Sequence, residues 1–557
     1  MFELFLKKNH NILLISILIL TIAAFWPVGS SDFVNYDDPD YVVKNELIKN
    51  LKSDNIAYYF THKTTDLYVP LVFVSYALDY KLFGLNPHAF HFMNLFWHIL
   101  NVLLVFSLVK SMSKNLFYPF FITSLFALHP LHVESVAWVT ERKDLLYSFF
   151  YLLAFFAWHK YRQKNKLSFL AVSLVCFILS CFSKPMAITF PAMILLYDLF
   201  YARLPVLKNT IRYVPFALVS LVFFYISVHF MDTSVRGSAN TGYNGFDKIF
   251  VPFYGLSFYL FKICVPFNLS VIYPYAQKTR GLLPLTYLIS PLLAGFMFWL
   301  VFFFKRSSPE VKAGFLVFIL SLLPVLQLIP NNYTVAADRY VYLPCLGLFF
   351  IIAALAKRLM EQKKLKGSTF KLIVTIVILV FAYSTYARTK VWKDSITLFS
   401  DVIEKYDNSD IAFHNRAIAY NREGKFNLAL NDLEKALQLD PKNADAWSNY
   451  GWTLSATGKY DEAIAALNKA IQLKPTLARA HNDLENTYGM TGRFDLALKQ
   501  LLTADSLSPG NPTFYNNIAF TYQKMGATPK AIGYYQKAAR LGLKEAQELL
   551  LRNNLTW

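Results

Sequence analysis

The chain has little charge and few cysteines for its length. Of its 557 residues only 16% are Asp, Glu, Lys or Arg, while 55% are hydrophobic, and this balance excludes a purely soluble globular protein. The four cysteines all lie in or beside apolar stretches, which excludes a disulfide framework and a zinc-binding pattern. The sequence has neither a G-x-x-x-x-G-K-[ST] loop nor a G-x-G-x-x-G motif. If the protein transfers a chemical group, we therefore expect a donor other than a nucleotide.

Acidic residues are scarcer than basic ones, and the positive charge is unevenly distributed. The net charge is +19, yet residues 395–557 carry 18 Lys and Arg against 17 Asp and Glu. Almost all of the basic excess therefore belongs to the apolar part, which argues against a nucleic-acid-binding protein. We predict an all-α protein with two domains, a polytopic membrane domain at 1–390 and a soluble helical-repeat domain at 391–557.

Eleven apolar stretches are long enough to cross a hydrocarbon core of about 30 Å. They lie near 11–28, 89–110, 116–134, 144–160, 167–183, 186–201, 213–230, 284–304, 313–330, 340–356 and 370–387. An odd number of spans places the two termini on opposite sides of the membrane. Because alternate connections differ in Lys and Arg content, we predict a cytoplasmic N-terminus and an extracytoplasmic repeat domain. In a bacterial inner membrane, the location that we expect, this domain would stand in the periplasm.

Two further apolar segments are too short or too polar to be assigned as spans. Residues 251–265 contain Lys262, and we predict an interfacial or re-entrant helix there. Residues 68–83 are expected to lie along the outer surface in the first loop.

Two adjacent carboxylates, Asp37 and Asp38 in the run NYDDPDY, follow the first predicted span within ten residues. Adjacent carboxylates at an apolar boundary can have their pKa values pushed apart, which suits a general base or a metal-assisted site. An Asp before Pro39 is also typical of an ordinary turn. We favour a catalytic role for the pair, without a choice between its members, and any divalent cation would bind the same two residues.

Basic residues on the same predicted face are candidates for binding an anionic headgroup. Lys184, in the tripeptide SKP between two spans, could equally be a snorkelling lysine at a helix end. Guanidinium groups suit bidentate phosphate binding, which adds Arg142, Arg280 and Arg339 to the candidates.

His129, His132 and Glu134 form a group at the end of the third predicted span, 116–134. Its spacing is not that of the H-E-x-x-H zinc motif. We therefore expect these three residues to form hydrogen bonds at the rim of the site and not to hold a structural zinc ion.

The C-terminal region repeats every 34 residues. The repeated columns are Gly424, Gly458, Gly492 and Gly526; Ala429, Ala463, Ala497 and Ala531; and Phe413, Trp447, His481 and Tyr515. Several columns in register predict four tetratricopeptide repeats. Residues 391–408 are predicted to form a preceding half repeat. Stacked helix pairs of this kind form a concave groove that usually binds a peptide or protein.

Four motifs precede the repeats in a fixed order: NYDDPDY (35–41), FALHPLHVESVAWVTERKDLL (126–146), FSKPMAITFPAMILLYDL (182–199) and ADRYVYLPCLGL (337–348). With the repeats, they resemble the transmembrane and tetratricopeptide-repeat-containing protein O-mannosyltransferases and their bacterial relatives, of the GT-C glycosyltransferase class. The resemblance covers nearly the whole chain. It implies a multi-span enzyme that moves a sugar from a polyprenyl or dolichyl phosphate to a protein Ser or Thr hydroxyl on the non-cytoplasmic side.

The resemblance also implies roles for individual residues. In GT-C enzymes an acidic residue of the first outer loop is catalytic, which corresponds here to Asp37 or Asp38. The family pattern Arg-Ala-Asp departs to Arg142-Lys143-Asp144, which adds a positive charge, and Arg339 matches an arginine of a recurrent family motif.

The expected mechanism is a single inverting displacement, in which Asp37 or Asp38 takes the acceptor proton while the sugar C1 is attacked. The expected stabilisers of the leaving lipid phosphate are Arg142, Lys184 and Arg339. A divalent cation is allowed but not required. The expected partners are a polyprenyl-phosphate-linked sugar, a secreted or membrane protein acceptor that binds the repeats, and membrane lipids, with no nucleic acid.

Two alternatives remain open at the level of the sequence. The first is an oligosaccharide transferase that uses a polyprenyl-diphosphate glycan, since some of those enzymes also carry repeats. The second is a non-catalytic membrane scaffold whose repeats recruit secreted proteins.

Overall fold

The computed structural model describes residues 10–65, 67–202, 210–230, 243–303, 308–328, 334–362, 366–507 and 509–557. The chain divides into two compact units, Met1–Asp401 and Val402–Trp557. Helix α18 (Ser395–Lys405) crosses this division. The protein is all-α, as predicted, because strands in the described ranges are limited to β1 (Tyr273–Pro274) and β2 (Thr334–Ala336), which pair antiparallel.

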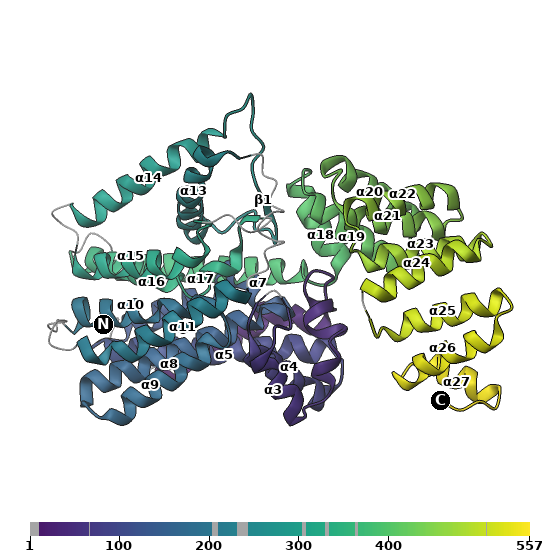
Figure 1. Ribbon diagram of the computed structural model, residues 1–557. Helices are drawn as coiled ribbons and strands as arrows, with labels where there is room; N and C mark the ends of the chain where they lie inside the picture. Colours follow the sequence, from purple (N-terminus) through teal and green to yellow (C-terminus); the bar gives the residue numbers. More distant parts are fainter. Residues whose placement is uncertain are drawn as a thin grey trace. The chain divides into compact units, whose positions relative to one another are not determined.

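The first unit is a bundle of helices of very different lengths (Figure 1). Its first half consists of α2 (His10–Phe25), α3 (Ser53–Thr61), α4 (Pro70–Phe83), α5 (Pro87–Met112), α6 (Phe117–Leu128), α7 (Val133–Ala137), α8 (Arg142–Lys164) and α9 (Leu167–Cys181). Its second half consists of α10 (Phe190–Leu196), α11 (Val214–Phe230), α13 (Gly245–Cys264), α14 (Leu285–Phe302), α15 (Pro309–Leu322), α16 (Cys345–Glu361) and α17 (Gly367–Lys390).

Every one of the eleven predicted spans falls on a helix of this unit, although the predicted ends at 304 and 330 lie outside the described residues. Among the residues that the structure describes, four helical segments are long and apolar enough to cross a membrane: His10–Ser30, Pro87–Met112, Leu285–Phe302 and Gly367–Lys390. A fifth is possible if the bent pair Phe117–Leu128 and Pro130–Ala137 forms one broken span. Shorter apolar helices cover Leu167–Cys181, Pro185–Tyr201 and Val214–Phe230. The total of eleven spans stays a prediction.

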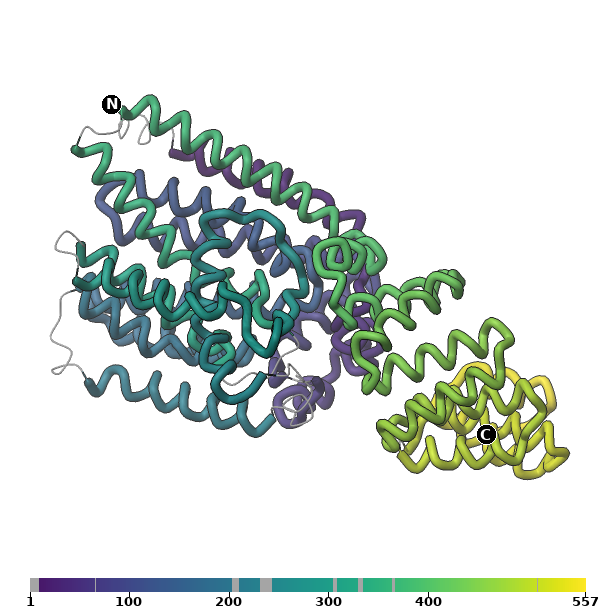
Figure 2. Tube along the Cα trace, turned by 90° about the horizontal axis from the view of Figure 1, so that it is seen from above, coloured from purple at the N-terminus to yellow at the C-terminus, as the bar shows by residue number. Residues whose placement is uncertain are grey.

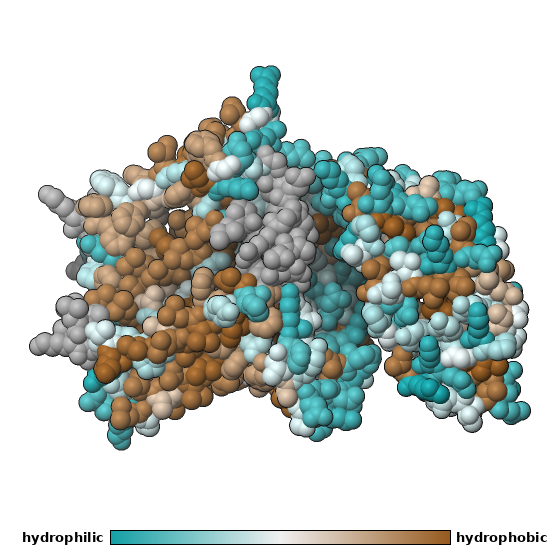
Figure 3. Space-filling view, in the orientation of Figure 1, coloured by the Kyte–Doolittle hydropathy of each residue, from teal (hydrophilic) through white to brown (hydrophobic). Residues whose placement is uncertain are grey.

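Apolar side chains cover much of the surface of the first unit. Figure 3 shows hydrophobic residues gathered over α8 to α11. Leu167 and Leu292 are 73% exposed, and Leu221 is 64% exposed. Such large exposed apolar areas are unfavourable in water and are what a lipid-facing surface requires.

Helix α13 contains the segment 251–265. It is one continuous helix of 20 residues with Pro252 inside it, so the re-entrant form that the sequence allowed is not what the structure shows. Figures 1 and 2 show α13 running across the direction of α15 and α16. Helices lying in an interface run across spanning ones, so this arrangement favours the interfacial alternative.

Helices α15 and α16 pack with their backbones in contact. A Cβ atom added to Gly314 would lie 2.6 Å from the Gly347 carbonyl oxygen, and one added to Gly347 would lie 2.4 Å from that of Gly314. Small residues at such a crossing allow the close approach that favours helix association in a membrane. The two glycines therefore fix the position of α16 and of the segment that precedes it.

The second unit consists of antiparallel helix pairs in series. The pairs are α19 (Asp410–Arg422) with α20 (Phe426–Leu439), α21 (Ala444–Ala456) with α22 (Tyr460–Leu473), α23 (Ala478–Met490) with α24 (Phe494–Leu507), and α25 (Pro512–Lys524) with α26 (Thr528–Arg540), followed by α27 (Lys544–Arg552). The repeated glycines follow the first helix of each pair with φ between 72° and 82°, a conformation that favours glycine. The repeated alanines are at most 2% exposed, where the paired helices meet. The predicted repeats are confirmed.

Glu485 breaks the pattern of small residues inside the repeats. It lies in the 34-residue column that Ala417, Gly451 and Ala519 occupy elsewhere, and it is only 4% exposed. The side-chain amide of Asn517 donates a long hydrogen bond of 3.5 Å to its carboxylate. Burial raises the pKa of Glu485 to about 7 from an ordinary value of 4.5.

We expect the stability of the third repeat to fall as the pH rises through neutrality. The pKa of Glu485 is higher in the folded than in the unfolded chain, so the folded chain binds more protons at pH values between the two. The contribution of Glu485 to stability is therefore complete below about pH 4.5 and is lost as the pH rises through about 7. Hydrogen-exchange protection factors of α23 in the full chain should fall roughly 10- to 100-fold between acidic and mildly alkaline pH. Glu485→Gln should flatten this dependence. Equal slopes in the two proteins would contradict the assignment.

Candidate functional site

The acidic loop that follows the first helical segment begins the site. Tight turns form here because the backbone N–H groups of Asp40 and Tyr41 both donate to the carbonyl oxygen of Asp37, at 3.1 Å, and Pro39 starts the next helical turn. This geometry directs the side chains of Asp37 and Asp38 differently.

Asp38 is completely buried and held by backbone groups. One carboxylate oxygen accepts the N–H of Val34 at 2.9 Å; the other accepts the N–H of Thr140 at 3.1 Å and the Thr140 hydroxyl. Burial raises the pKa of Asp38 to about 7, although its three hydrogen bonds favour the ionised form. The Asp38 side chain makes no capping hydrogen bond to the turn that follows it, and its carboxylate instead ties the acidic loop to the segment before α8.

Asp37 is the accessible member of the pair. Its side chain is 37% exposed, and its carboxylate lies 3.8 Å from the ammonium group of Lys143. Lys143 itself is only 7% exposed at the side chain and also lies near the rings of Tyr41 and Trp138, at 5.1 and 5.7 Å. An exposed carboxylate beside a buried cation can be reached by a substrate while its orientation is restrained.

Glu141 lies at the centre of three cations. Its side chain is 1% exposed, and its oxygens lie 3.1 Å from Lys143, 3.5 Å from Lys184 and 3.2 Å from Arg339. Although burial by itself raises the pKa of Glu141, the three cations hold it below its usual range. These three contacts bring together α8, the turn after α9 and the segment before α16.

Two more carboxylates complete this charged cluster, which we define as Asp37, Glu134, Glu141, Asp144, Lys143, Lys184 and Arg339. The ammonium group of Lys184 donates to Asp144, and the guanidinium group of Arg339 donates to Glu134. The Arg339 backbone N–H also donates to Glu134, at 3.1 Å. Among the three cations, Arg339 is the most exposed, at 14% of its side chain, and it lies over the Trp138 and Tyr340 rings.

The bend between α6 and α7 explains how Glu134 reaches the cluster. His129 precedes Pro130 and is extended, as residues before proline usually are, so the chain turns by 52° between the two helical segments. The short helix α7 then carries Glu134 toward the Arg339 segment, and these two residues are 205 positions apart in the sequence.

His129 and His132 were expected at the rim of the site, but the structure places both in the interior at 0% exposure. His129 bonds the Ile263 carbonyl oxygen at 2.9 Å and accepts the N–H of Leu131 at 3.3 Å. His132 bonds the Phe126 carbonyl oxygen at 2.7 Å and the Cys345 sulfur at 3.3 Å. Each ring nitrogen thus has a protein partner, because the α6–α7 bend packs both rings against α16 and its neighbours.

Arg142 also differs from its expected setting. Its side chain is fully buried; the guanidinium group donates to Asp79, to the Asn94 side-chain oxygen at 2.8 Å and to the Phe90 carbonyl oxygen at 2.9 Å. The Tyr76 ring lies 4.8 Å away. A contact between Arg142 and a donor phosphate stays a prediction. In the structure the guanidinium group already donates hydrogen bonds to Asp79, Asn94 and Phe90. Arg280, the remaining candidate, lies exposed in the Thr279–Leu282 turn.

We expect Arg142→Met to act on folding and not on phosphate binding. Removal of one partner leaves the buried Asp79 carboxylate uncompensated, which costs about 3–5 kcal/mol. The thermal midpoint of the detergent-solubilised protein should fall, and a second change, Asp79→Leu, should restore part of the loss. An unchanged midpoint, combined with weaker binding of a lipid phosphate, would instead support the phosphate contact predicted from the sequence.

The geometry does not suit a divalent cation at the aspartate pair. Both oxygens of Asp38 already accept hydrogen bonds from protein groups. Within the described ranges, no group of three or more His, Cys, Asp or Glu side chains is arranged to hold a metal ion. We therefore derive no chemical step through a metal.

Sequence reasoning missed the partners of the cations. Glu141 and Asp144 were part of a recognised motif, but nothing local indicated that they pair with Lys184, which is 40 positions from Asp144. Lys143 was noted only as a departure from a family pattern, and the structure makes it the partner of Asp37. The one available signal was the density of charge in residues 141–144 within an apolar region.

Comparisons with known proteins agree with the predicted resemblance. A family model described as tetratricopeptide repeat matches residues 420–484. The chain is 25% identical to human protein O-mannosyl-transferase TMTC3 over 430 residues. This match covers 71% of this chain and 46% of the human protein. It is 23% identical to human protein O-mannosyl-transferase TMTC1, over 70% of this chain and 50% of that protein. The match to Caenorhabditis elegans protein O-mannosyl-transferase F38B6.6 is 23% identical, over 77% of this chain and 63% of that protein.

The chain thus spans about half the length of the human relatives it matches. Among solved structures, the crystal structure of MamA is 25% identical and covers 30% of this chain and 96% of that one, with a TM-score of 0.26. MamA from Desulfovibrio magneticus RS-1 is 19% identical over 26% of this chain and 82% of that one, with a TM-score of 0.25.

Proposed function

We propose that this protein is a membrane glycosyltransferase of the GT-C class that moves a sugar, mannose in the first instance, from a polyprenyl phosphate to a protein hydroxyl group. Similarity over 70–77% of the chain to proteins named protein O-mannosyl-transferases supports the reaction class. The donor, and transfer on the extracytoplasmic side of the membrane, are parts of the proposal.

The exposed Asp37 carboxylate beside buried cations is the observation that carries the proposal. A hydroxyl acceptor needs a base that it can reach, and Asp37 is the member of the pair with an exposed side chain. Lys143, at 3.8 Å, restrains the orientation of this carboxylate. Asp38 acts as a positioning residue, since it connects the acidic loop to Val34 and Thr140.

The reaction is a single inverting displacement. The carboxylate of Asp37 takes the proton of the acceptor hydroxyl as its oxygen forms a bond to C1 of the sugar. On the opposite face of C1, the bond to the phosphate oxygen breaks, and the lipid phosphate leaves with the bonding electrons. Charge is balanced because the negative charge lost at Asp37 appears on the leaving phosphate.

Cations of the charged cluster stabilise that leaving group. Arg339 is the best placed, because it is the most exposed cation and its planar group can bind two phosphate oxygens. Lys184, at 6% exposure, contributes from a deeper position as a fixed positive charge. Buried carboxylates keep these cations in place before the donor binds.

The repeats serve the acceptor in this proposal. The stacked helix pairs of the second unit form the kind of scaffold that binds extended peptides or proteins. Binding of the acceptor there would raise its effective concentration near the membrane without any contribution to the chemical step.

The test follows a radiolabelled sugar leaving its lipid. Purified full-length protein in lipid nanodiscs would receive polyprenyl-phosphate mannose with a Ser/Thr-containing acceptor protein. Movement of label from lipid to protein would support the proposal. Transfer only from a polyprenyl-diphosphate oligosaccharide would favour the oligosaccharide transferase, and acceptor binding without transfer from either donor would favour the scaffold.

A further inference from the structure

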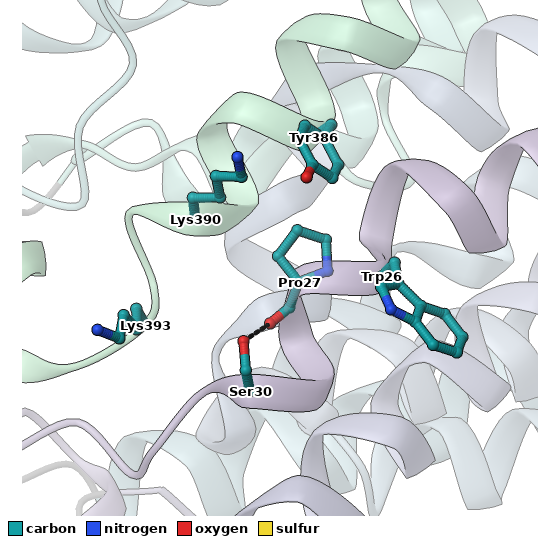
Figure 4. A pocket seen from close by; sticks show the side chains of 6 residues that line it. All are labelled: Trp26, Pro27, Ser30, Tyr386, Lys390 and Lys393. Atoms are coloured by element: carbon teal, nitrogen blue, oxygen red, sulfur yellow. Dashed lines mark hydrogen bonds between the residues drawn. The ribbon is translucent and has the colours of Figure 1, made fainter.

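A hollow of about 350 Å³ lies where the first and last long helices of the first unit end. It is lined by Trp26, Pro27, Ser30, Tyr386, Lys390 and Lys393. Figure 4 shows these side chains around the opening, with Trp26 and Pro27 coming from the end of the first helical segment and the two lysines from the end of α17 and just after it. The volume is within the range of small-ligand sites.

Both helices that meet at the hollow are candidate membrane spans. His10–Ser30 and Gly367–Lys390 are apolar over their lengths, and Figure 2 shows α2 and α17 running side by side. The two helices run in the same direction, so the C-terminal ends of both reach the hollow. Trp and Tyr at the end of a span are typical of the headgroup level of a bilayer. The hollow is therefore placed at the boundary between hydrocarbon and water.

An exposed apolar stripe leads along each helix to the hollow. Along the segment His10–Ser30 the exposed residues recur at helical spacing and end at a lining residue: Ile12, Ile15, Ile19, Ile22 and Trp26. On α17 they do the same: Leu372, Ile376, Leu379, Tyr383 and Tyr386. Their exposures range from 37% to 74%. Two such stripes offer acyl chains an apolar surface that leads to the same opening.

The lining of the hollow carries two positive charges and no negative one. Within the residues that the structure describes, neither Lys390 nor Lys393 forms an ion pair, and no acidic residue lines the opening. The ammonium group of Lys390 lies 4.4 Å from the centre of the Tyr386 ring. This leaves two positive charges available to a negatively charged group from the bilayer.

We propose that this hollow binds the headgroup of an anionic glycerophospholipid, of the phosphatidylglycerol type. The phosphate lies between Lys390 and Lys393, and Trp26 and Tyr386 flank the glycerol; the Ser30 hydroxyl, which donates to the Pro27 carbonyl oxygen at 3.0 Å, can accept a hydrogen bond from a glycerol hydroxyl. The acyl chains follow the two apolar stripes. Two lysines together with interfacial aromatics favour this lipid over a zwitterionic one, whose own positive charge would approach the lysines.

The site is separate from the charged cluster. The rings of Trp392 and Trp138 stack between them with centroids 5.7 Å apart, and each is 1% exposed. The two sites are nevertheless connected by backbone, because the N–H of Asp32 donates to the carbonyl oxygen of Lys393 at 2.8 Å. A lipid bound at Lys393 would therefore also hold the beginning of the acidic loop.

Native mass spectrometry of the full-length protein tests this proposal. Detergent-solubilised protein would be exposed to equal amounts of phosphatidylglycerol and phosphatidylcholine, and retained lipids counted. We expect preferential retention of phosphatidylglycerol, and a loss on the order of tenfold in that preference for Lys390→Gln with Lys393→Gln. The matched control is Lys44→Gln with Lys52→Gln, which removes the same charge from exposed positions in the first loop and should retain the preference.

A second measurement keeps the proposal testable if the double variant fails to fold. Phosphatidylglycerol carrying a photoreactive headgroup should label peptides that contain Trp26 or Tyr386 in the unaltered protein. Labelling confined to other helices, or an unchanged lipid preference in a folded double variant, would overturn the proposal. Displacement of phosphatidylglycerol by a small excess of polyprenyl phosphate would also overturn it, because the occupant would then be the sugar carrier.

Discussion

Asp37→Asn is expected to abolish sugar transfer while the protein folds normally. The side chain is 37% exposed and its ion pair with Lys143, at 3.8 Å, is long, so its contribution to stability is small. Loss of a general base lowers the rate of the chemical step by about 10²- to 10⁴-fold. The measurement is the rate at which labelled sugar leaves polyprenyl-phosphate mannose in nanodiscs, at saturating donor.

Two neighbouring aspartates provide the controls. Asp40 lies exposed in the same loop, and Asp40→Asn should leave transfer unchanged. Asp38→Asn should lower stability as well as transfer, since an amide nitrogen would face the N–H groups of Val34 or Thr140, and a buried unsatisfied donor costs about 1–3 kcal/mol. Full transfer by a folded Asp37→Asn protein would exclude Asp37 as the base.

Glu141→Gln is expected to be the most damaging single change in the charged cluster. It removes the negative charge that lies within 3.5 Å of Lys143, Lys184 and Arg339. Each cation then keeps one carboxylate partner, Asp37, Asp144 or Glu134, but three buried charge pairs are broken, and breaking a buried pair costs about 3–5 kcal/mol although Gln has nearly the same shape as Glu. We expect a lower thermal midpoint of the first unit, measured by unfolding in detergent, and weaker transfer through displacement of the cations.

Glu46→Gln is the matched control for Glu141. Glu46 pairs with Lys49 at 2.5 Å, but its side chain is 77% exposed, so water replaces the lost interaction and the change should cost less than about 1 kcal/mol. Equal effects of the two substitutions would show that Glu141 does not organise the cations. Donor binding by Glu141→Gln, measured separately from transfer, would distinguish displaced cations from a wholly unfolded protein.

The charged cluster explains why ionisable residues persist in an apolar domain. Each buried cation of the cluster has a carboxylate partner, and each of its buried carboxylates has a cation. This pairing keeps charged groups at the site in the absence of a donor. The ion pairs, and not contact with water, offset the free-energy cost of burying these charged groups.

The sequence by itself determined the helical architecture of this protein. Spans and repeats are local in the chain: a span is a continuous apolar stretch, and the repeats return every 34 residues, so composition and periodicity indicate both. Candidates such as Lys184 and Arg339 could be named for the same reason, since charge within an apolar region is visible in the sequence. The interior position of His129 and His132 was not predictable, because their partners Ile263 and Cys345 are remote.

Only the tertiary structure decided which charged groups meet and which carboxylate a substrate can reach. Asp37 and Asp38 are neighbours with identical chemistry, and they differ because Asp38 accepts hydrogen bonds from Thr140, 102 positions away. Likewise, Arg339 meets Glu134 through the packing of α7 against the segment before α16. Contacts between remote positions depend on how bent and broken helices pack against one another, and no local pattern of residues encodes that arrangement.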